Sequence, residues 1–256
     1  MNKKTTIWIV SGMTGVLVLA VIYSFYFRSP SPFPTNEHLI EELQDTFPAF
    51  PEVGDSEILE VFDVGERKKY VPLVTSEGSY GSSYWVWDKY KWKVESVDTK
   101  GGPRIWKANK GDPSTYHIVW NIHPNDRVKY IDFHVLRDRG YSIANGTDET
   151  YYPRIQMKQT VSLEEKSYGV LQLPKEWASF VSGLNDTYAA QQPDLFFNQL
   201  YTEQQVSFGW IPYDTNNEEI FPNHSVNGSG FSNGGGDAFA YLSILNEYDL
   251  EVWSGE

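Results

Sequence analysis

The sequence predicts an α+β fold, mainly antiparallel β-sheet with a few short helices, on an N-terminal single transmembrane helix. Residues 7–27 form an uninterrupted apolar run, which predicts the transmembrane helix. Between residues 57 and 173, short stretches alternate apolar and polar side chains and are separated by turn residues, which favours an antiparallel sheet. Apolar residues recur at helical spacing only in a few short segments.

The apolar run reads IWIVSGMTGVLVLAVIYSFYF and contains no charged residue and no Pro, Asn or Gln. As a helix with a rise of about 1.5 Å per residue it reaches about 31 Å, the thickness of a bilayer core. The run is longer than the about 7–15 apolar residues of a secretory signal, and no small-x-small cleavage pair follows it. We therefore expect an uncleaved membrane anchor.

The charges beside the run predict its orientation. Lys3 and Lys4 precede it, whereas only Arg28 follows it closely, and positive residues stay on the cytoplasmic side. The bulk of the chain is therefore expected outside the cytoplasm, at the cell membrane. The Pro-rich spacer, which contains SPSPFPT, is expected to be stiff and to hold the domain away from the bilayer. The expected segments are a cytoplasmic tail at 1–6, a span in the lipid bilayer at 7–27, the spacer at 28–35 and an extracytoplasmic sheet-rich domain at 36–256.

Charge is unevenly distributed along the chain. Residues 29–66 carry ten acidic residues and residues 176–256 carry twelve, with no Lys or Arg in either segment. Residues 67–175 hold eighteen Lys and Arg against twelve acidic residues. Nucleic acid is a poor partner for the acidic segments and is not expected. The chain has no cysteine, which excludes disulfides and, for an exported chain, favours a bacterial cell envelope.

Alternation and turn residues predict the individual elements. Strands are expected at 57–62, 69–74, 83–87, 90–97, 103–107, 115–123, 129–137, 153–161, 167–173 and 206–212. Helices are expected at 36–47, 174–184 and 194–201. Residues 238–245 fit either a helix or a strand, and we favour a strand paired with 250–253.

An aromatic stretch, YWVWDKYKWKV, begins at Tyr84. A tight turn at Asp88-Lys89 would pair Trp85 with Trp92, so that Trp85, Trp87 and Trp92 share one face of a hairpin. If this row is exposed, it predicts ligand-binding residues on which sugar rings stack. If it is buried, it is core, and the large area that aromatic side chains bury favours this alternative.

A second stretch, from Tyr116 to Leu136, contains three of the five histidines of the chain. Matching the apolar faces of its two strands pairs Trp120 with Phe133 in a hairpin, and His117, Asp132 and His134 then share the outer face. These three are the best zinc ligands that the sequence offers. Their spacing does not match a known metal motif, however, and a polar outer face without metal is the favoured alternative.

Two loops contain partial motifs. Residues 226–237 include G-x-S-x-G at Gly230–Gly234, but no His follows Ser232, so the hydrolase order is excluded and we expect a mobile surface loop. Residues 214–219 alternate oxygen-bearing side chains as calcium loops do. The sixth position is Glu219 rather than Gly, which excludes an EF-hand but leaves an irregular calcium site open.

These features predict a membrane-anchored extracytoplasmic interaction or binding module of unknown ligand, associated with the bacterial cell envelope. An acidic envelope polymer would meet the basic residues of 67–175, and a membrane protein is the other expected type of partner. No cofactor is expected, with calcium or zinc as the weaker alternatives. The alternative function is an extracytoplasmic hydrolase that depends on a metal or on carboxylates.

Overall fold

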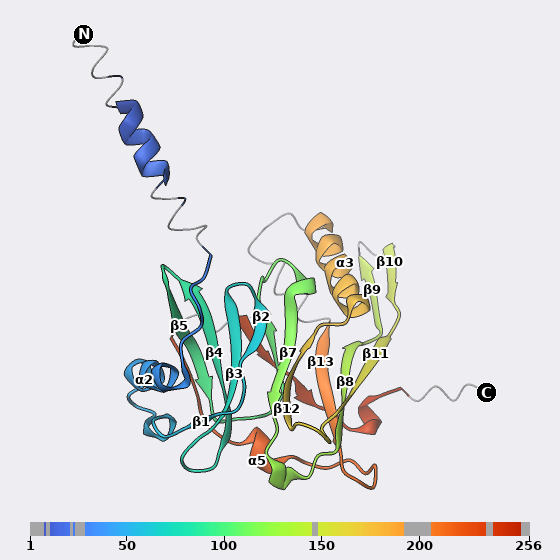
Figure 1. Cartoon of the computed structure of the whole chain (residues 1–256). Helices are drawn as coiled ribbons and strands as arrows, with labels where there is room; N and C mark the ends of the chain where they lie inside the picture. Colours follow the sequence, from blue (N-terminus) through green and yellow to red (C-terminus); the bar gives the residue numbers. More distant parts are fainter. Residues whose placement is uncertain are drawn as a thin grey trace.

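Three β-sheets lie face to face, with one helix covering the outer face of the first sheet (Figure 1). The computed structural model describes residues 8, 11–20, 23, 29–144, 148–191, 206–233 and 238–251. Most of the described strand pairs are antiparallel and the helices are few, which confirms the predicted fold class for this part of the chain. Within the described residues, no helix is both long and apolar enough to cross a membrane.

The first sheet has the strand order β1-β3-β4-β5-β14, with β2 paired to β3. On its outer face, helix α2 (Asn36–Thr46) buries Leu39 and Leu43 against the tryptophans of β4 and β5. Tyr70 and Tyr84 point from the inner face toward the second sheet. The strands are β1 (Glu57–Ile58), β2 (Phe62–Gly65), β3 (Lys68–Val74), β4 (Tyr80–Asp88), β5 (Lys91–Asp98) and β14 (Gly230–Ser232).

The second sheet, in the order β12-β7-β6-β15, is the middle layer. Successive side chains of a strand point to opposite faces, and here both faces are buried. Trp106 and Val119 pack on the first sheet, whereas Ile105 and Ile118 pack on the third. Its strands are β6 (Arg104–Lys107), β7 (Tyr116–Asn121), β12 (Tyr168–Gln172) and β15 (Phe239–Tyr241).

The third sheet has the order β11-β8-β13-β16. Helix α3 (Lys175–Gln191) buries Trp177 and Val181 in the core that this sheet shares with the second. The remaining strands, β9 (Gly140–Ala144) and β10 (Asp148–Tyr152), form a separate two-stranded ribbon. The strands of the third sheet are β8 (Tyr130–Arg137), β11 (Ile155–Ser162), β13 (Ser207–Tyr213) and β16 (Ser243–Ile244).

Residues 230–244 contribute an edge strand to each of the three large sheets. Strand β14 pairs with β5, β15 pairs with β6, and β16 pairs in parallel with β13. This segment therefore connects all three layers. Residues 238–245 were predicted to pair with 250–253; instead β15 pairs with β6 and β16 with β13, and residues 252 and 253 lie outside the described residues. The Gly-rich stretch expected to be a mobile surface loop contains a strand at 230–232, which pairs with β5.

The hairpin of β4 and β5 differs in register from the prediction. The turn residues are Lys89 and Tyr90, both with positive φ, and Trp87 lies opposite Trp92. Moving the turn by one residue shifts each pairing by two positions, so the same face still carries the tryptophans. The shift removes Tyr90 from the buried face, and the Asp88 carboxylate accepts a hydrogen bond from Lys93 at 2.6 Å.

The predicted hairpin of residues 115–137 is wrong. Strand β7 pairs with β6 and β12, whereas β8 pairs with β11 and β13 in another sheet. The apolar faces were matched correctly, since the Trp120 and Phe133 rings lie 5.6 Å apart. They meet across the space between two sheets, because burying both faces of β7 requires a layer on each side.

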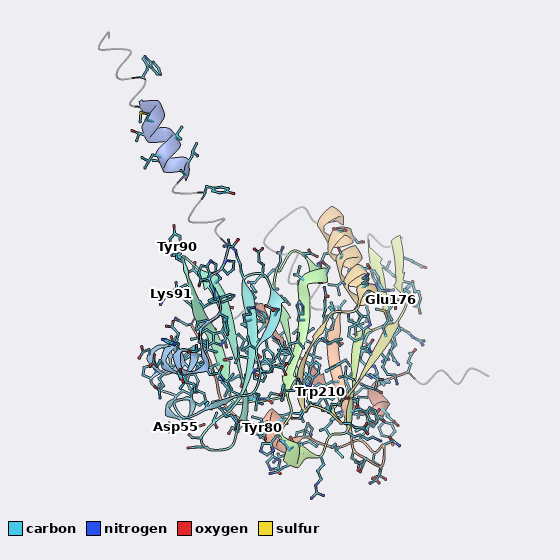
Figure 2. All side chains as sticks on the ribbon, in the orientation of Figure 1. Asp55, Tyr80, Tyr90, Lys91, Glu176 and Trp210 are labelled. Atoms are coloured by element: carbon cyan, nitrogen blue, oxygen red, sulfur yellow. The ribbon has the colours of Figure 1, made fainter. Side chains whose placement is uncertain are left out.

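Other predicted strands of 57–173 are confirmed, except that 57–62 is divided between β1 and β2. The predicted helix at 36–47 is confirmed as α2, and the one at 174–184 as α3, which continues to Gln191. The predicted helix at 194–201 lies outside the described residues. Sequence patterning missed the β9–β10 ribbon. The ends of the first sheet are useful landmarks: Tyr90 and Lys91 mark what we term the upper end, and Asp55 and Tyr80 the lower end (Figure 2).

Candidate functional site

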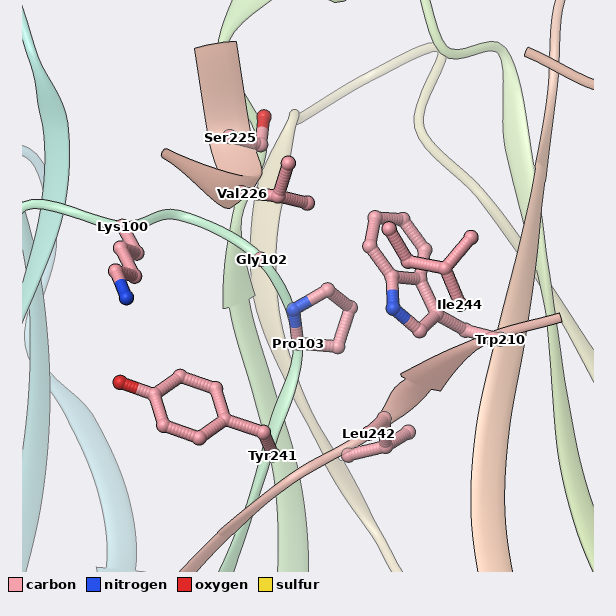
Figure 3. A pocket seen from close by; sticks show the side chains of 9 residues that line it. All are labelled: Lys100, Gly102, Pro103, Trp210, Ser225, Val226, Tyr241, Leu242 and Ile244. Atoms are coloured by element: carbon pink, nitrogen blue, oxygen red, sulfur yellow. The ribbon is translucent and has the colours of Figure 1, made fainter. Parts of the chain in front are cut away.

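A pocket of about 190 Å³ lies where segments of all three layers meet (Figure 3). It is formed by the connection from β5 to β6, by β13, by the short helix α5 (Asn223–Val226) and by β15 and β16. Figure 3 shows Pro103 between a polar side and an apolar side. The lining residues are Lys100, Gly102, Pro103, Trp210, Ser225, Val226, Tyr241, Leu242 and Ile244.

The polar side of the pocket carries Lys100 and Tyr241. The Lys100 ammonium nitrogen lies 5.4 Å from the centroid of the Tyr241 ring, and the Arg104 guanidinium carbon lies 3.9 Å from it. Both contacts are cation–π interactions, which hold the ring in place. The Tyr241 hydroxyl donates to Asp98 at 3.3 Å. Lys100 therefore gives this end of the pocket a positive charge, whereas Arg104 lies behind the ring and is paired with Asp98.

Asp98 and Arg104 form a buried ion pair behind this end. Their closest atoms are 2.7 Å apart, and the Asp98 carboxylate also accepts the Lys100 backbone N–H at 2.7 Å. Burial raises the pKa of Asp98, and the Arg104 guanidinium counteracts that rise. Burial also raises the pKa of the neighbouring Tyr84 to about 12. The Tyr84 phenol is thus neutral at physiological pH and cannot act as a general base there.

The connection at residues 99–103 reaches the pocket because it contains Gly101 and Gly102. The Gly101 backbone lies directly against the backbone of Asn121, where no side chain fits. The Gly102 N–H donates to the Ser225 carbonyl oxygen at 2.8 Å, which ties the connection to α5. The two glycines thus let the chain pass close to Asn121 and α5, which brings Lys100 and Pro103 to the edge of the pocket.

A polar cluster around Asp126 lies directly beside the pocket, since its member Ser225 also lines it. The Asp126 carboxylate accepts hydrogen bonds from the Ser225 hydroxyl at 2.5 Å and from the Ser225 backbone at 2.8 Å. Its other oxygen contacts His224 Nδ1 at 2.7 Å. The His224 ring is half exposed and stacks on His123 at 4.9 Å.

The cluster contains the side-chain types of a serine hydrolase in an unproductive arrangement. A nucleophilic serine donates to histidine, which a carboxylate orients. Here the Ser225 hydroxyl donates to Asp126 itself, accepts the His123 N–H at 2.9 Å and is fully buried. The cluster therefore fixes η3 (Pro124–Asp126) to α5 and offers no activated nucleophile.

The tryptophans expected as ligand-binding residues or as core lie in the buried cluster beneath α2. Trp85, Trp87 and Trp92 have exposed fractions of 1%, 8% and 6%. Trp92 also donates from its indole nitrogen to the Ser31 carbonyl oxygen at 3.0 Å. These three tryptophans are therefore core residues, and they do not form an exposed row on which sugar rings could stack.

The three histidine-face residues are not brought together. Their strands belong to two different sheets: His117 lies on the face of β7 that packs on the first sheet, whereas Asp132 and His134 lie on the face of β8 that points away from the second sheet. His117 contacts the Thr115 carbonyl oxygen at 2.9 Å, and Asp132 accepts from Lys158 at 3.1 Å. The three side chains of the predicted zinc site are therefore not assembled among the described residues.

The structure describes no group of three or more His, Cys, Asp or Glu side chains that could hold a metal ion. In the loop where an irregular calcium site was left open, Asp214 accepts the backbone N–H groups of Asn216 and Glu218 at 2.7 and 3.0 Å. The alternating polar residues thus belong to a turn that the Asp214 side chain stabilises.

Sequence reasoning missed the pocket because Lys100, Trp210 and Tyr241 lie far apart in the chain and each resembles an ordinary surface or core residue. The run Gly101-Gly102-Pro103 is the one local signal, and by itself such a run indicates only a turn. Comparison with known proteins found no matching family, no matching curated protein and no matching solved structure. The functional argument therefore depends on the geometry.

Proposed function

We propose that this chain is a membrane-anchored extracytoplasmic binding module of the bacterial cell envelope, whose pocket binds one anionic, ring-sized unit of an envelope polymer. The observation that carries the proposal is the pocket itself. Trp210, Leu242 and Ile244 give it an apolar wall, and Lys100 and Tyr241 give it a cationic, hydrogen-bonding end. A volume of about 190 Å³ is below the roughly 300–1,000 Å³ of sites for drug-sized ligands, so it suits a single ring.

The anchor is supported by the apolar run at 7–27 and by the character of its described part. Residues 11–20 are helical, and all their side chains are exposed. Met13, Leu17 and Leu19 have exposed fractions of 65–69%. An apolar helix whose side chains are left exposed by the described part of the fold is costly in water and stable in a bilayer. Protease added to intact cells should digest the domain; protection until the membrane is permeabilised would contradict the orientation.

The ligand is tested by titrating the full chain, held in a lipid nanodisc, with oligogalacturonate and with a neutral glucan oligomer of equal length. We expect the anionic oligomer alone to bind, and more weakly at high salt. Lys100→Gln and Tyr241→Ala should each weaken binding several-fold. Lys175→Gln, a matched change of an exposed lysine on α3, should leave it unchanged. Equal binding by Lys100→Gln and the unmodified chain would refute this site.

The hydrolase alternative is favoured by one observation, the contact of half-exposed His224 with buried Asp126. In many hydrolases a carboxylate orients the histidine that acts as the general base. The test is a screen of ester, glycoside and phosphoester substrates with the full chain. Turnover that His224→Ala abolishes and His38→Ala retains would replace the binding proposal with the hydrolase.

A further inference from the structure

The spacer is not free, because its residues are bound to the first sheet. The Ser31 carbonyl oxygen accepts the Trp92 indole N–H at 3.0 Å. The Phe33 ring packs edge-on against Trp92 at 5.0 Å and against Trp85 at 5.8 Å. Trp92 is the second residue of β5, next to the β4–β5 turn, so the spacer joins the domain at its upper end (Figure 1). The described part of the spacer thus packs on the domain, and only residues 28–30 separate the apolar run from the first contact with the first sheet.

The length of chain between anchor and domain sets an upper limit on their separation. Four peptide units connect Phe27, the last residue of the apolar run, to Ser31. An extended chain covers at most about 3.6 Å per residue, so these units span at most about 14 Å. The headgroup layer on one side of a bilayer is itself about 5–8 Å thick. An anchor that ends at the bilayer surface thus brings the upper end of the domain against the headgroups.

This end carries an exposed aromatic surface on the β9–β10 ribbon. Tyr141 lies opposite Tyr151 and Ile143 lies opposite Glu149, so these four side chains share one face, which we term the tyrosine face. The exposed fractions of Tyr141, Ile143 and Tyr151 are 60%, 55% and 62%. Figure 1 shows the ribbon at the end of the molecule from which the N-terminal segment leaves.

The β4–β5 turn lies at the same end and has a related composition. Tyr90 has an exposed fraction of 39% and stands between Lys89 and Lys91 (Figure 2). Tyrosine is enriched where membrane meets water, because its ring is apolar and its hydroxyl stays hydrated. Lysine side chains are attracted to anionic headgroups. Two separate segments at this end therefore offer the side chains that suit a bilayer interface.

We infer that the upper end of the domain rests on the surface of the bilayer that holds the anchor, with the tyrosine face and the β4–β5 turn among the lipid headgroups. The inference rests on the proposed anchor. Each contact is weak by itself, but a short tether keeps the domain at a high effective concentration near the lipid. On this arrangement the lower end, marked by Asp55 and Tyr80, points away from the membrane.

The chain has no cysteine, so single labels can be placed without removing any native residue. We would label Ile143→Cys and Tyr151→Cys with an environment-sensitive fluorophore, in the full chain bound to vesicles containing nitroxide lipids. Phe221→Cys is the matched control, since Phe221 is 64% exposed and precedes α5 at the lower end (Figure 1). Lipid quenching should be several-fold stronger at residues 143 and 151 than at residue 221.

Flotation of the vesicles separates the two possible failures. If the chain floats with the vesicles but residues 143 and 151 are quenched no more than residue 221, the anchor stands and the inference is refuted. If the label at 143 is shielded from both nitroxide lipid and aqueous iodide, another protein surface covers the tyrosine face, which also refutes it. If the chain does not float, the anchor fails and the inference fails with it.

Discussion

The backbones of Gly101 and Asn121 are in direct contact, and the Asn121 N–H donates to the Gly101 carbonyl oxygen at 2.8 Å. A Cβ atom added at Gly101 would lie 1.7 Å from the Asn121 carbonyl oxygen. This contact joins the connection that carries Lys100 to β7, one of the two inner strands of the middle sheet. It therefore couples the shape of the pocket to the packing of the layers.

Gly101→Ala should lower the free energy of unfolding by about 3 kcal/mol or more, because the overlap forces two backbones apart. Urea denaturation measures the effect. Gly111→Ala is the control, since the nearest atom to its added Cβ is 3.8 Å away, an ordinary contact. Equal stability of the two variants would show that the connection can move without cost.

Asn121→Leu should destabilise the fold although Leu is apolar and similar in size. The Asn121 side chain is fully buried and donates to the carbonyl oxygens of Leu73 and Gly81 at 2.9 and 2.6 Å. A buried carbonyl that loses its donor costs about 1–3 kcal/mol. Asn227→Leu, on an exposed side chain, should change the melting temperature little. Unchanged stability of Asn121→Leu would mean that the link between the first and second sheets is dispensable.

Trp92→Ala should cost about 3–5 kcal/mol of stability, the range found for buried aromatic residues. It removes packing beneath α2 and the hydrogen bond that holds Ser31. Tyr248→Ala, at a side chain 97% exposed, should have no measurable effect on thermal unfolding. A Trp92→Ala variant of normal stability that has lost glycan binding would instead support the sugar-stacking interpretation.

Asp126→Asn should weaken the fold at neutral pH and reduce its sensitivity to acid. Burial alone would raise the pKa of Asp126, but hydrogen bonds from Ser225 and His224 outweigh burial and hold it below its ordinary value of 3.8. A carboxyl whose pKa is lower in the folded state stabilises above pH 3.8, and this stabilisation is lost as the pH falls through the folded value. The expected loss at neutral pH is about 1.5–3 kcal/mol, the range for hydrogen bonds to charged groups.

The measurement is chemical denaturation from neutral pH down to pH 3 for the Asp126→Asn variant and the unmodified chain. Asp55→Asn, at an exposed carboxyl, is the control and should follow the unmodified chain. Parallel pH profiles for Asp126→Asn and the unmodified chain would rule out this role of the cluster.

Local patterning predicted most strands because alternation and turn residues act over a few neighbouring positions. It could not predict partners. Trp120 and Phe133 have the same pattern whether their strands pair edge to edge or pack face to face, and only the burial of both faces of β7 decides between these arrangements. Strands β9 and β10 were missed because their exposed face carries Tyr141 and Tyr151, which an alternation of apolar-inside and polar-outside residues does not anticipate.

The pocket could not be predicted from the sequence, because its residues come from distant segments of the chain. Lys100, Trp210 and Tyr241 are brought together only by pairings between distant strands. By contrast, the sequence did present burial of the tryptophan row as the favoured alternative, because the size of those side chains alone argues for it. Large buried side chains are thus predictable from composition, whereas a pocket made of ordinary residues requires the fold.

The three edge strands at residues 230–244 also determine when the protein can finish folding. None of the three large sheets is complete until this last segment has been synthesised, and the hydrogen bond from Ser96 to Phe231 joins positions 135 residues apart. Contacts at such long separation make folding slow. Until they form, β5, β6 and β13 each present unpaired backbone groups, which invite pairing with other chains. A chain that stops before residue 230 leaves three such edges open at once, and aggregation is its expected fate.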